Sequence, residues 1–419
     1  MLVVSGGKSL SGKVKISGSK NATLPILGAS LLVNGKMTLK NVPKINDVKV
    51  FLEIIQELGA SYSFEGNTLT LDTSHLDVDN LNLEKIKKIR ASILLLSPLL
   101  FFFGNISIPF PGGCSIGARP IDSHLNGLKA IGYDYTFENN HISLNGKLKS
   151  GDIVLNAGFG VTSTENLIVA NVLRTGQTTI MASAIEPHVM NLISFLRVAG
   201  ADIKIRYDHT IIINGVENLT DGFEFEVVSD YIESGTFAIM GALASKDYID
   251  IENARIVDLY MFLEKLKEAG VKWEDMGDDT LRVYRSQNLK KVNLQTNIYP
   301  GFPTDLQSPF AVLQTQCDGI SKIHEVLFEG RLNWLVELES MGADLQILNP
   351  HQAIIVGKSN LKGGRTVTSW DLRAGASMVI AGLIAPGETR VDKVEYIFRG
   401  YENFVDKLKG LGAEIRLEG

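Results

Sequence analysis

The chain has 419 residues, more than one simple hydrophobic core accommodates, so we expect two domains. With 45% apolar and 21% charged residues, its composition is typical of globular proteins and of neither disordered nor fibrous ones. The net charge of −6 argues against non-specific binding to nucleic acid. Any site for an anion must therefore be a local cluster of lysine and arginine.

We expect neither a membrane partner nor export. Residues 1–7 soon turn polar and lack the apolar centre of a signal peptide. The apolar run 91–103 is too short to span a bilayer, and we expect a buried helix there. The two cysteines, Cys114 and Cys317, make no disulfide framework, so a reducing cytoplasm is the expected location.

One pattern recurs six times along the chain: an amphipathic helix that ends in glycine, then a strand, a turn and a second strand. The period is roughly 70 residues, longer than the unit of a solenoid. Six such βαβ-type units predict two domains of three units each, with helices packed inside three-sided sheets, although an open α/β sandwich has the same pattern. The six helix-ending glycines are Gly59, Gly132, Gly200, Gly270, Gly342 and Gly412.

The first candidate for an anion site is Lys20. Residues 13–22 follow the pattern of a strand, a Gly/Ser loop and the start of a helix. The N-terminus of a helix attracts anions, so Lys20 is placed to hold a phosphate or a carboxylate. The alternative is a solvated lysine at an ordinary helix cap.

The loop 110–120 is the most informative segment, because it sets Cys114 among glycines five residues before Arg119. Backbone N–H groups in a glycine-rich loop approach an anion closely, and arginine offers a fork of donors to phosphate or carboxylate. A thiol there suits a nucleophile or a proton donor to a phosphorylated small molecule. The alternative is a surface turn beside a buried structural cysteine.

Asp305 lies in a rigid aromatic turn, 299–307, where two prolines and a glycine restrict the backbone. If apolar neighbours surround it, such an aspartate acts as a general base. The alternative is that Thr304 or Asp305 caps the helix that follows.

Several further residues are read in the same two ways. Arg331, Arg373 and Arg399 each suit an anion site or an ordinary ion pair, His124 suits the filling of a helix face, and Cys317 suits packing in an apolar stretch. No spaced group of histidines, cysteines and carboxylates is evident, so we expect no metal and no cofactor.

Taken together, these segments resemble the enolpyruvyl transferase family. The cysteine loop is highly specific, and it argues against the sister enzyme of the shikimate pathway, which lacks it. The matching motifs follow the family's order and span nearly the whole chain: Gly18–Asn21, Arg90–Ser92, Pro111–Pro120, Tyr299–Gln307, Asp371–Ala374 and Arg399–Glu402.

The resemblance implies a two-domain inside-out α/β barrel built from the six βαβ-type repeats. It implies a discontinuous first domain, 1–20 and 229–419, and a second domain, 21–228. The implied reaction transfers the enolpyruvyl group of phosphoenolpyruvate to the 3′-hydroxyl of UDP-N-acetylglucosamine and releases phosphate. That reaction belongs to peptidoglycan precursor synthesis, and it implies two small-molecule substrates and sensitivity to fosfomycin.

The resemblance also implies the roles of individual residues. Cys114 would protonate the enol or add to phosphoenolpyruvate, and Asp305 would take the hydroxyl proton. Lys20, Arg119, Arg373 and Arg399 would neutralise phosphate and carboxylate. The implied substrate-binding residues are Asn21, Arg90, Arg119, Pro120, Ile121, Asp122, Ser123, Gly160, Val161, Thr162, Leu327, Arg331 and Arg373.

Four departures from the family motifs leave two alternatives open. Tyr231 stands where the family has arginine, Gly160 begins an altered phosphate-contacting run, and Gly330 and Phe398 replace an asparagine and an aspartate. One alternative is a paralogue that acts on another nucleotide or nucleotide sugar. The other is a non-catalytic protein that binds a UDP-sugar, which the retained Cys114 and Asp305 argue against.

Overall fold

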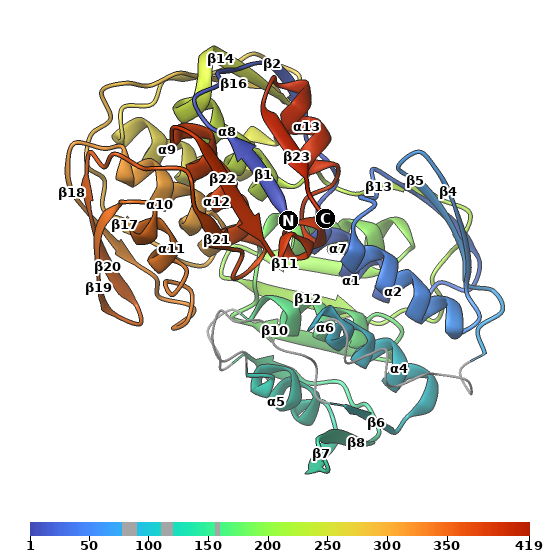
Figure 1. The fold of residues 1–419 in the computed structure, drawn as a ribbon. Helices are drawn as coiled ribbons and strands as arrows, with labels where there is room; N and C mark the ends of the chain where they lie inside the picture. The colour runs from blue at the N-terminus through green and yellow to red at the C-terminus, as the bar shows by residue number, and fades with distance from the viewer. Residues whose placement is uncertain (78–89, 110–119, 156–159) are drawn as a thin grey trace. The chain divides into compact units, whose positions relative to one another are not determined.

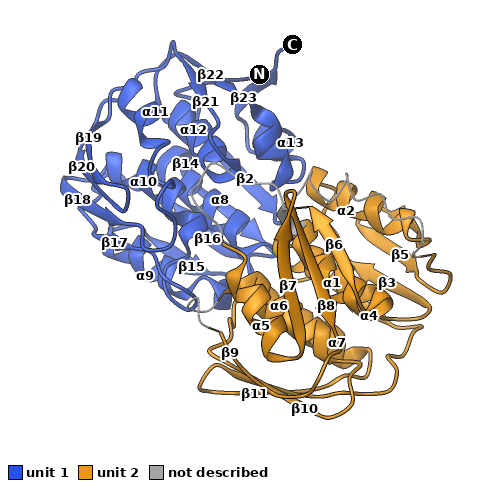
Figure 2. Cartoon of the chain, turned by 90° about the horizontal axis from the view of Figure 1, so that it is seen from below, with its two compact units in different colours: residues 1–17, 114–118, 229–419 blue, residues 18–113, 119–228 orange. Residues whose placement is uncertain are grey.

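The computed structural model describes residues 1–77, 90–109, 120–155 and 160–419, without the side chains of residues 90 and 91. The described chain divides into two compact units, coloured separately in Figure 2. Among these residues, unit 1 comprises Met1–Ser17 and Ser229–Gly419, and unit 2 comprises the residues from Gly18 to Val228. In this division Lys20 lies in unit 2.

Unit 1 contains three four-stranded sheets. The N-terminal segment completes two of them: β1 lies between β22 and β23, and β2 pairs in parallel with β14, so the two ends of the chain lie together in Figure 1. In order across each sheet, the strands are β21 (Thr366–Thr368), β22 (Glu388–Asp392), β1 (Leu2–Ser5) and β23 (Glu414–Leu417); β15 (Trp273–Asp275), β16 (Leu281–Tyr284), β14 (Ser245–Glu252) and β2 (Leu10–Lys15); and β17 (Leu294–Gln295), β18 (Gly319–His324), β20 (Gln352–Gly357) and β19 (Asp344–Asn349).

Unit 2 repeats this plan, with two four-stranded sheets and one of three strands among the described residues. Its last strand, β13, pairs in parallel with β3. The strands are β13 (Glu224–Glu226), β3 (Lys36–Lys40), β5 (Thr68–Asp72) and β4 (Ser61–Glu65); β11 (Asp202–Arg206), β12 (Thr210–Asn214), β10 (Gln177–Met181) and β9 (Asp152–Val154); and β6 (Ile106–Pro109), β8 (His141–Gly146) and β7 (Tyr133–Glu138).

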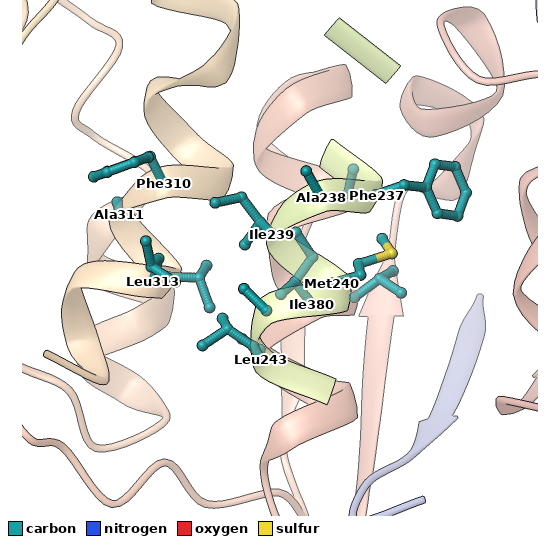
Figure 3. Packing of buried hydrophobic residues seen from close by; sticks show 14 of the residues in the cluster. Phe237, Ala238, Ile239, Met240, Leu243, Phe310, Ala311, Leu313 and Ile380 are labelled. Atoms are coloured by element: carbon teal, nitrogen blue, oxygen red, sulfur yellow. The ribbon is translucent and has the colours of Figure 1, made fainter. Parts of the chain in front are cut away.

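Three helices form the core of unit 1: α8 (Tyr231–Ala244), α10 (Gln307–Thr315) and α12 (Leu372–Ile384). Every residue of α8 and α10 is buried, because each helix is surrounded by other elements. Figure 3 shows the contact, in which Ile239 and Leu243 of α8 face Leu313 of α10 and Ile380 of α12. These helices lie inside the sheets, so the fold is an inside-out α/β barrel in each unit.

The remaining helices follow the same division. In unit 2, α1 (Lys20–Ser30), α4 (Leu96–Phe103) and α6 (Val161–Asn171) contribute residues to the hydrophobic core. The other helices are α2 (Asn46–Glu57), α5 (Asp122–Ala130), α7 (Pro187–Val198), α9 (Tyr260–Glu268), α11 (Leu335–Ser340) and α13 (Phe404–Gly410), with 3₁₀ turns η2 (Arg90–Leu95), η3 (Ile256–Asp258), η4 (Thr304–Leu306) and η5 (Val394–Arg399).

The prediction of six glycine-terminated helices is confirmed. All six glycines have a positive φ, between 86° and 103°, which side chains other than glycine rarely adopt. The expectation of one helix over 91–103 was only partly right, because η2 precedes α4 there. Pro98 falls in the first turn of α4, where its missing N–H costs no hydrogen bond within the helix.

Candidate active site

Asp305 lies in η4, directly before the core helix α10 of unit 1. The turn before it is closed by backbone bonds from Gly301 N to Ile298 O and from Asn297 N to Phe302 O. Phe302 is buried and holds this turn to the core. The proposed capping role for Thr304 or Asp305 was wrong, since neither η4 nor α10 has a side-chain cap.

Two arginines hold the carboxylate of Asp305. Arg331 donates from Nη2 to Oδ1 at 2.8 Å, and Arg373 donates from Nε to Oδ2 at 3.1 Å. The arginine side chains are 3% and 1% exposed, whereas that of Asp305 is 28% exposed. The structure therefore brings together three of the predicted site residues and leaves one side of the carboxylate open to solvent.

The charges around Asp305 differ from the apolar surroundings that the sequence interpretation required. Burial lowers the pKa of Arg331, but the carboxylates of Asp305, Asp371 and Glu325 outweigh it and raise that pKa above its usual value. Burial likewise lowers the pKa of Arg373, and Tyr401 and Asp305 raise it by more. Both guanidinium groups are therefore positively charged, and each attracts the carboxylate that it contacts.

A buried carboxylate that the sequence analysis did not identify, Glu325, is linked by hydrogen bonds to Thr304 and, through it, to Arg331. Glu325 accepts a hydrogen bond from Thr304 Oγ1 at 2.7 Å and from Leu327 N at 3.0 Å. Thr304 Oγ1 in turn accepts from Arg331 Nη1 at 3.1 Å. This chain of bonds holds Nη1 of Arg331, while Asp305 holds Nη2. Leu327, a predicted binding residue, has 36% of its surface exposed.

Arg373 is placed by the start of α12. Asp371 caps this helix and accepts hydrogen bonds from the backbone N–H groups of Arg373 at 2.7 Å and Ala374 at 3.0 Å. The guanidinium carbon lies 5.1 Å from the ring centre of Tyr401. Nη1 and Nη2 of Arg373 are buried and have no hydrogen-bond partner among the described residues. Buried donors of this kind are suited to an anion.

Arg399 ends η5, and its side chain is partly buried. The next residue, Gly400, packs against the start of α12, since an added Cβ would come within 2.6 Å of Leu372 Cδ1. Arg399 therefore lies near the helix that carries Arg373. Tyr231, the departure from the family's arginine, is the first residue of α8 and is 6% exposed.

In unit 2, Lys20 is the first residue of α1, whose cap Ser19 accepts from Ala22 N at 3.3 Å. Lys20 Nζ lies 3.7 Å from Oδ2 of Asp47, and the two side chains are 13% and 6% exposed. The solvated lysine of the alternative interpretation is therefore wrong. Asn21, the next predicted residue, is partly buried.

The segments 120–123 and 160–162 meet in unit 2. A Cβ added at Gly160 would come within 3.1 Å of Ser123 Oγ, which places these two predicted residues side by side. Asp122 and Pro120 are exposed, whereas the side chain of Ile121 is buried in the core. Any substrate contact at Ile121 must therefore use its backbone.

Thr162 contacts a histidine that the sequence interpretation assigned to helix packing. His124 Nε2 lies 3.0 Å from Thr162 Oγ1, and His124 Nδ1 lies 3.0 Å from Asn166 Nδ2. His124 and Asn166 are 3% and 1% exposed. Neither residue was among the predicted site residues, although Asn166 ends the run, 160–166, that the resemblance matched to a phosphate-contacting loop.

Some predicted residues lie outside this description. Cys114 and Arg119 are outside the described residues, as is the side chain of Arg90. Cys317 is buried in the core of unit 1, as its apolar surroundings in the sequence suggest, and burial raises its pKa to about 12.

The described ranges contain neither a metal-binding cluster nor a helix suited to a membrane. Across 1–77, 90–109, 120–155 and 160–419, no three His, Cys, Asp or Glu side chains gather where they could hold a metal ion. In the same part of the chain, no helix combines the length and the apolar character that crossing a membrane requires.

Comparisons with known proteins agree with this geometry. The profile of the family described as EPSP synthase (3-phosphoshikimate 1-carboxyvinyltransferase) matches residues 4–408. The UDP-N-acetylglucosamine 1-carboxyvinyltransferase of Desulfosudis oleivorans is 41% identical, with 99% of this chain and 98% of that protein covered. The protein of the same name from Idiomarina loihiensis is 42% identical, with 98% of both chains covered.

Solved structures share the fold over its full length. The enolpyruvyl transferase NikO from Streptomyces tendae matches with a TM-score of 0.90 at 25% identity, covering 99% of this chain and 98% of that one. EPSP synthase from Acinetobacter baumannii matches with a TM-score of 0.70 at 17% identity, covering 99% of each chain. The chain therefore belongs to the enolpyruvyl transferase family and is an enzyme of the transferase class.

Proposed function

We propose that this enzyme transfers the enolpyruvyl group of phosphoenolpyruvate to the 3′-hydroxyl of UDP-N-acetylglucosamine and releases phosphate. The observation that carries the proposal is the carboxylate of Asp305, held between Arg331 and Arg373 beside buried donors of Arg373 that have no hydrogen-bond partner among the described residues. The names of the full-length relatives support the same acceptor. They do not favour the paralogue with another acceptor or the non-catalytic binder.

The reaction requires an acid, a base and charge neutralisation. The acceptor's oxygen adds to C2 of phosphoenolpyruvate while a proton adds to C3, which gives a tetrahedral ketal. The C2–O bond to phosphate then breaks, and C3 loses a proton to restore the double bond. Each stage keeps negative charge on the carboxylate and the phosphate, so fixed cations around them lower the barrier.

Residues of unit 1 would serve the hydroxyl and the ketal. Asp305 takes the proton of the 3′-hydroxyl, because two arginines hold its carboxylate in place and its side chain is 28% exposed. Arg373 offers Nη1 and Nη2 to the substrate anion while its Nε holds Asp305. Arg399, near the same helix, adds a second charge.

Unit 2 would supply the remaining groups. Lys20, largely buried beside Asp47, is assigned to the phosphate of phosphoenolpyruvate. Ser123 and Gly160 adjoin each other, and with Thr162 they are assigned to the nucleotide sugar. Cys114 is assigned to proton donation at C3 from the sequence motif alone. Units 1 and 2 are taken to be the two domains that the resemblance implies.

The same proposal fixes the enzyme's place in the cell. Enolpyruvyl transfer to this sugar is the first committed step of peptidoglycan precursor synthesis, and so it bears on cell shape and division. Its water-soluble substrates fit a cytoplasmic location. Fosfomycin, which mimics phosphoenolpyruvate, is the expected inhibitor.

The test is release of phosphate from phosphoenolpyruvate in the presence of UDP-N-acetylglucosamine, UMP and several other UDP-sugars. We expect turnover with UDP-N-acetylglucosamine and a loss of kcat of about a hundred- to ten-thousandfold in Asp305→Asn. Asp318→Asn, at an exposed position of the same unit, is the matched control. Turnover with UMP or another UDP-sugar, but not with UDP-N-acetylglucosamine, would support the paralogue, and binding without turnover would support the non-catalytic protein.

A further inference from the structure

A row of hydrogen bonds in unit 2 begins at two backbone groups and ends at Thr162. The amide of Asn166 donates from Nδ2 to the carbonyl of Ile93 at 2.9 Å, and its Oδ1 accepts from the N–H of Ser97 at 3.4 Å. A backbone carbonyl only accepts and a backbone N–H only donates. The orientation of the amide is therefore fixed, with Nδ2 facing His124.

That orientation decides which nitrogen of His124 carries the hydrogen. Asn166 Nδ2 lies 3.0 Å from His124 Nδ1, so Nδ1 accepts a hydrogen bond and has no hydrogen of its own. The hydrogen of the neutral ring is then on Nε2, which lies 3.0 Å from Thr162 Oγ1. His124 donates to the hydroxyl oxygen, and the hydroxyl hydrogen of Thr162 must point away from the ring.

The neighbouring hydroxyls are used differently. Ser163 Oγ and Thr164 Oγ1 both donate to the carbonyl of Gly160, at 2.9 and 2.8 Å. The hydroxyl of Thr162 is partly exposed, and its hydrogen has no acceptor among the described residues. The family's run has its hydroxyl at the position of Gly160 and a glycine at the position of Thr162, so this chain offers a donor two residues further on.

We propose that Asn166 and His124 are positioning residues that turn the hydroxyl of Thr162 outward as a donor to a diphosphate oxygen of the acceptor. This inference rests on the proposed function and deepens it. Thr162 makes the contact, and the two buried residues set its direction. The hydroxyl of Thr162 would then replace part of the affinity for the acceptor that is lost because residue 160 is glycine and has no hydroxyl.

The first test is a calorimetric titration with UDP, paired with the KM for UDP-N-acetylglucosamine. Thr162→Val keeps the shape of the side chain and removes the hydroxyl. We expect the Kd for UDP and the KM for UDP-N-acetylglucosamine to rise about ten- to a hundredfold, the effect of losing one hydrogen bond to a charged group. Thr162→Ser should restore most of the affinity, and the KM for phosphoenolpyruvate should not move. Thr136→Val, at an exposed position of β7, is the matched control.

The second test reads the direction of the bonds. In ¹⁵N spectra of histidine-labelled enzyme, with His124 assigned by its loss in His124→Gln, we expect hydrogen on Nε2 and none on Nδ1. Asn166→Asp has no donor for Nδ1, so the hydrogen should move to Nδ1 and the affinity for UDP should fall even though Thr162 is intact. Adding Thr162→Val to Asn166→Asp should then lower the affinity for UDP only slightly further.

The outcomes separate this inference from the function on which it rests. If wild-type enzyme neither binds UDP nor turns over UDP-N-acetylglucosamine, the proposed function is wrong and this inference falls with it. If it does both and Thr162→Val leaves both constants unchanged, only the inference is wrong. Hydrogen on His124 Nδ1 in wild-type enzyme also overturns it.

Discussion

Arg373 donates from Nε to Oδ2 of Asp305 at 3.1 Å, across 68 positions of the chain. The bond uses one nitrogen of the guanidinium, and the other two stay buried without a hydrogen-bond partner in the described part of the structure. A single side chain can therefore hold the candidate base and still receive the substrate anion. A planar group with several donors is required for both tasks.

This dual task predicts the behaviour of Arg373→Lys. Lysine keeps the charge but has one nitrogen, so it cannot serve Asp305 and an anion in the same geometry. We expect kcat/KM for phosphoenolpyruvate to fall about ten- to a hundredfold, which corresponds to about 1.5–3 kcal/mol. Arg365→Lys, at an exposed position of unit 1, is the control in the same steady-state assay. An unchanged kcat/KM in Arg373→Lys would show that the free nitrogens bind nothing in the reaction.

A second prediction concerns stability and the buried pair of Glu233 and Lys407. Lys407 Nζ donates to Glu233 Oε1 and to Ser17 Oγ, both at 2.6 Å, and Glu233 accepts from Ser17 N at 2.9 Å. Lys407→Met removes the partner of a carboxylate that is 1% exposed, so we expect a loss of about 3–5 kcal/mol of unfolding free energy.

Urea unfolding at neutral pH measures this loss. Lys409→Met, on the exposed side of the same helix, should change the unfolding free energy by less than about 0.5 kcal/mol. The double variant Lys407→Met/Glu233→Gln should recover part of the loss, because a neutral amide needs no counter-charge. A single variant as stable as wild type would mean that the pair contributes nothing.

The third prediction is a dependence on pH caused by Glu165. Burial first, and then the charge of Glu186, raise the pKa of Glu165 well above its usual value of 4.5. The folded state therefore holds a proton that the unfolded state releases as the pH rises past 4.5. The contribution of Glu165 to the unfolding free energy therefore falls as the pH rises above 4.5, until the pH exceeds the pKa of Glu165 in the folded state.

Glu165→Gln removes that penalty, since glutamine has the same shape and no charge. We expect the variant and wild type to have similar unfolding free energies near pH 4. As the pH rises to 8, the unfolding free energy of the variant should increasingly exceed that of wild type. Glu217→Gln, at an exposed position of the same unit, should show no such trend. A constant difference across this range would contradict the assignment.

The fourth prediction distinguishes the two cysteines. Cys317 is fully buried, its Sγ donates to Leu313 O at 3.4 Å, and burial followed by the charge of Asp318 raises its pKa to about 12. A thiol in that state does not react at neutral pH. We expect fosfomycin or a thiol reagent to label Cys114 and to spare Cys317, as read by mass spectrometry of peptides. Protein unfolded in guanidinium should be labelled at both, and preferential labelling of Cys317 in folded protein would overturn the assignment.

The sequence predicted those structural features that depend on residues close together in the chain. The six helix-ending glycines and the turn that carries Asp305 are of this kind, because a left-handed residue or a proline acts within a few positions. The partners of Asp305 are not, since Arg331 and Arg373 lie 26 and 68 positions away. Neither the role of Glu325 nor the contact of His124 with Thr162, 38 positions on, has a local pattern.

The altered run at Gly160 shows the same limit. In the sequence, the glycine appears as a lost hydroxyl and a weakened substrate site. In the structure, a Cβ at this position would clash with Ser163 Oγ, which occupies that space and donates to the carbonyl of Gly160. Ser163, where the family has alanine, therefore occupies space that a side chain at 160 would need. We therefore expect the departures at 160 and 163 to be energetically coupled, because both side chains would use the same space.

The last prediction tests that coupling. Gly160→Ser alone should destabilise unit 2 by about 1–3 kcal/mol, because its side chain and that of Ser163 compete for one space. Ser163→Ala frees the space, so the double variant should be more stable than the sum of the single effects by about 0.5–3 kcal/mol. Gly151→Ser, where an added Cβ meets no atom closer than 3.8 Å, is the control. Urea unfolding of the four proteins closes the cycle, and strictly additive free energies would show that the two positions are not coupled.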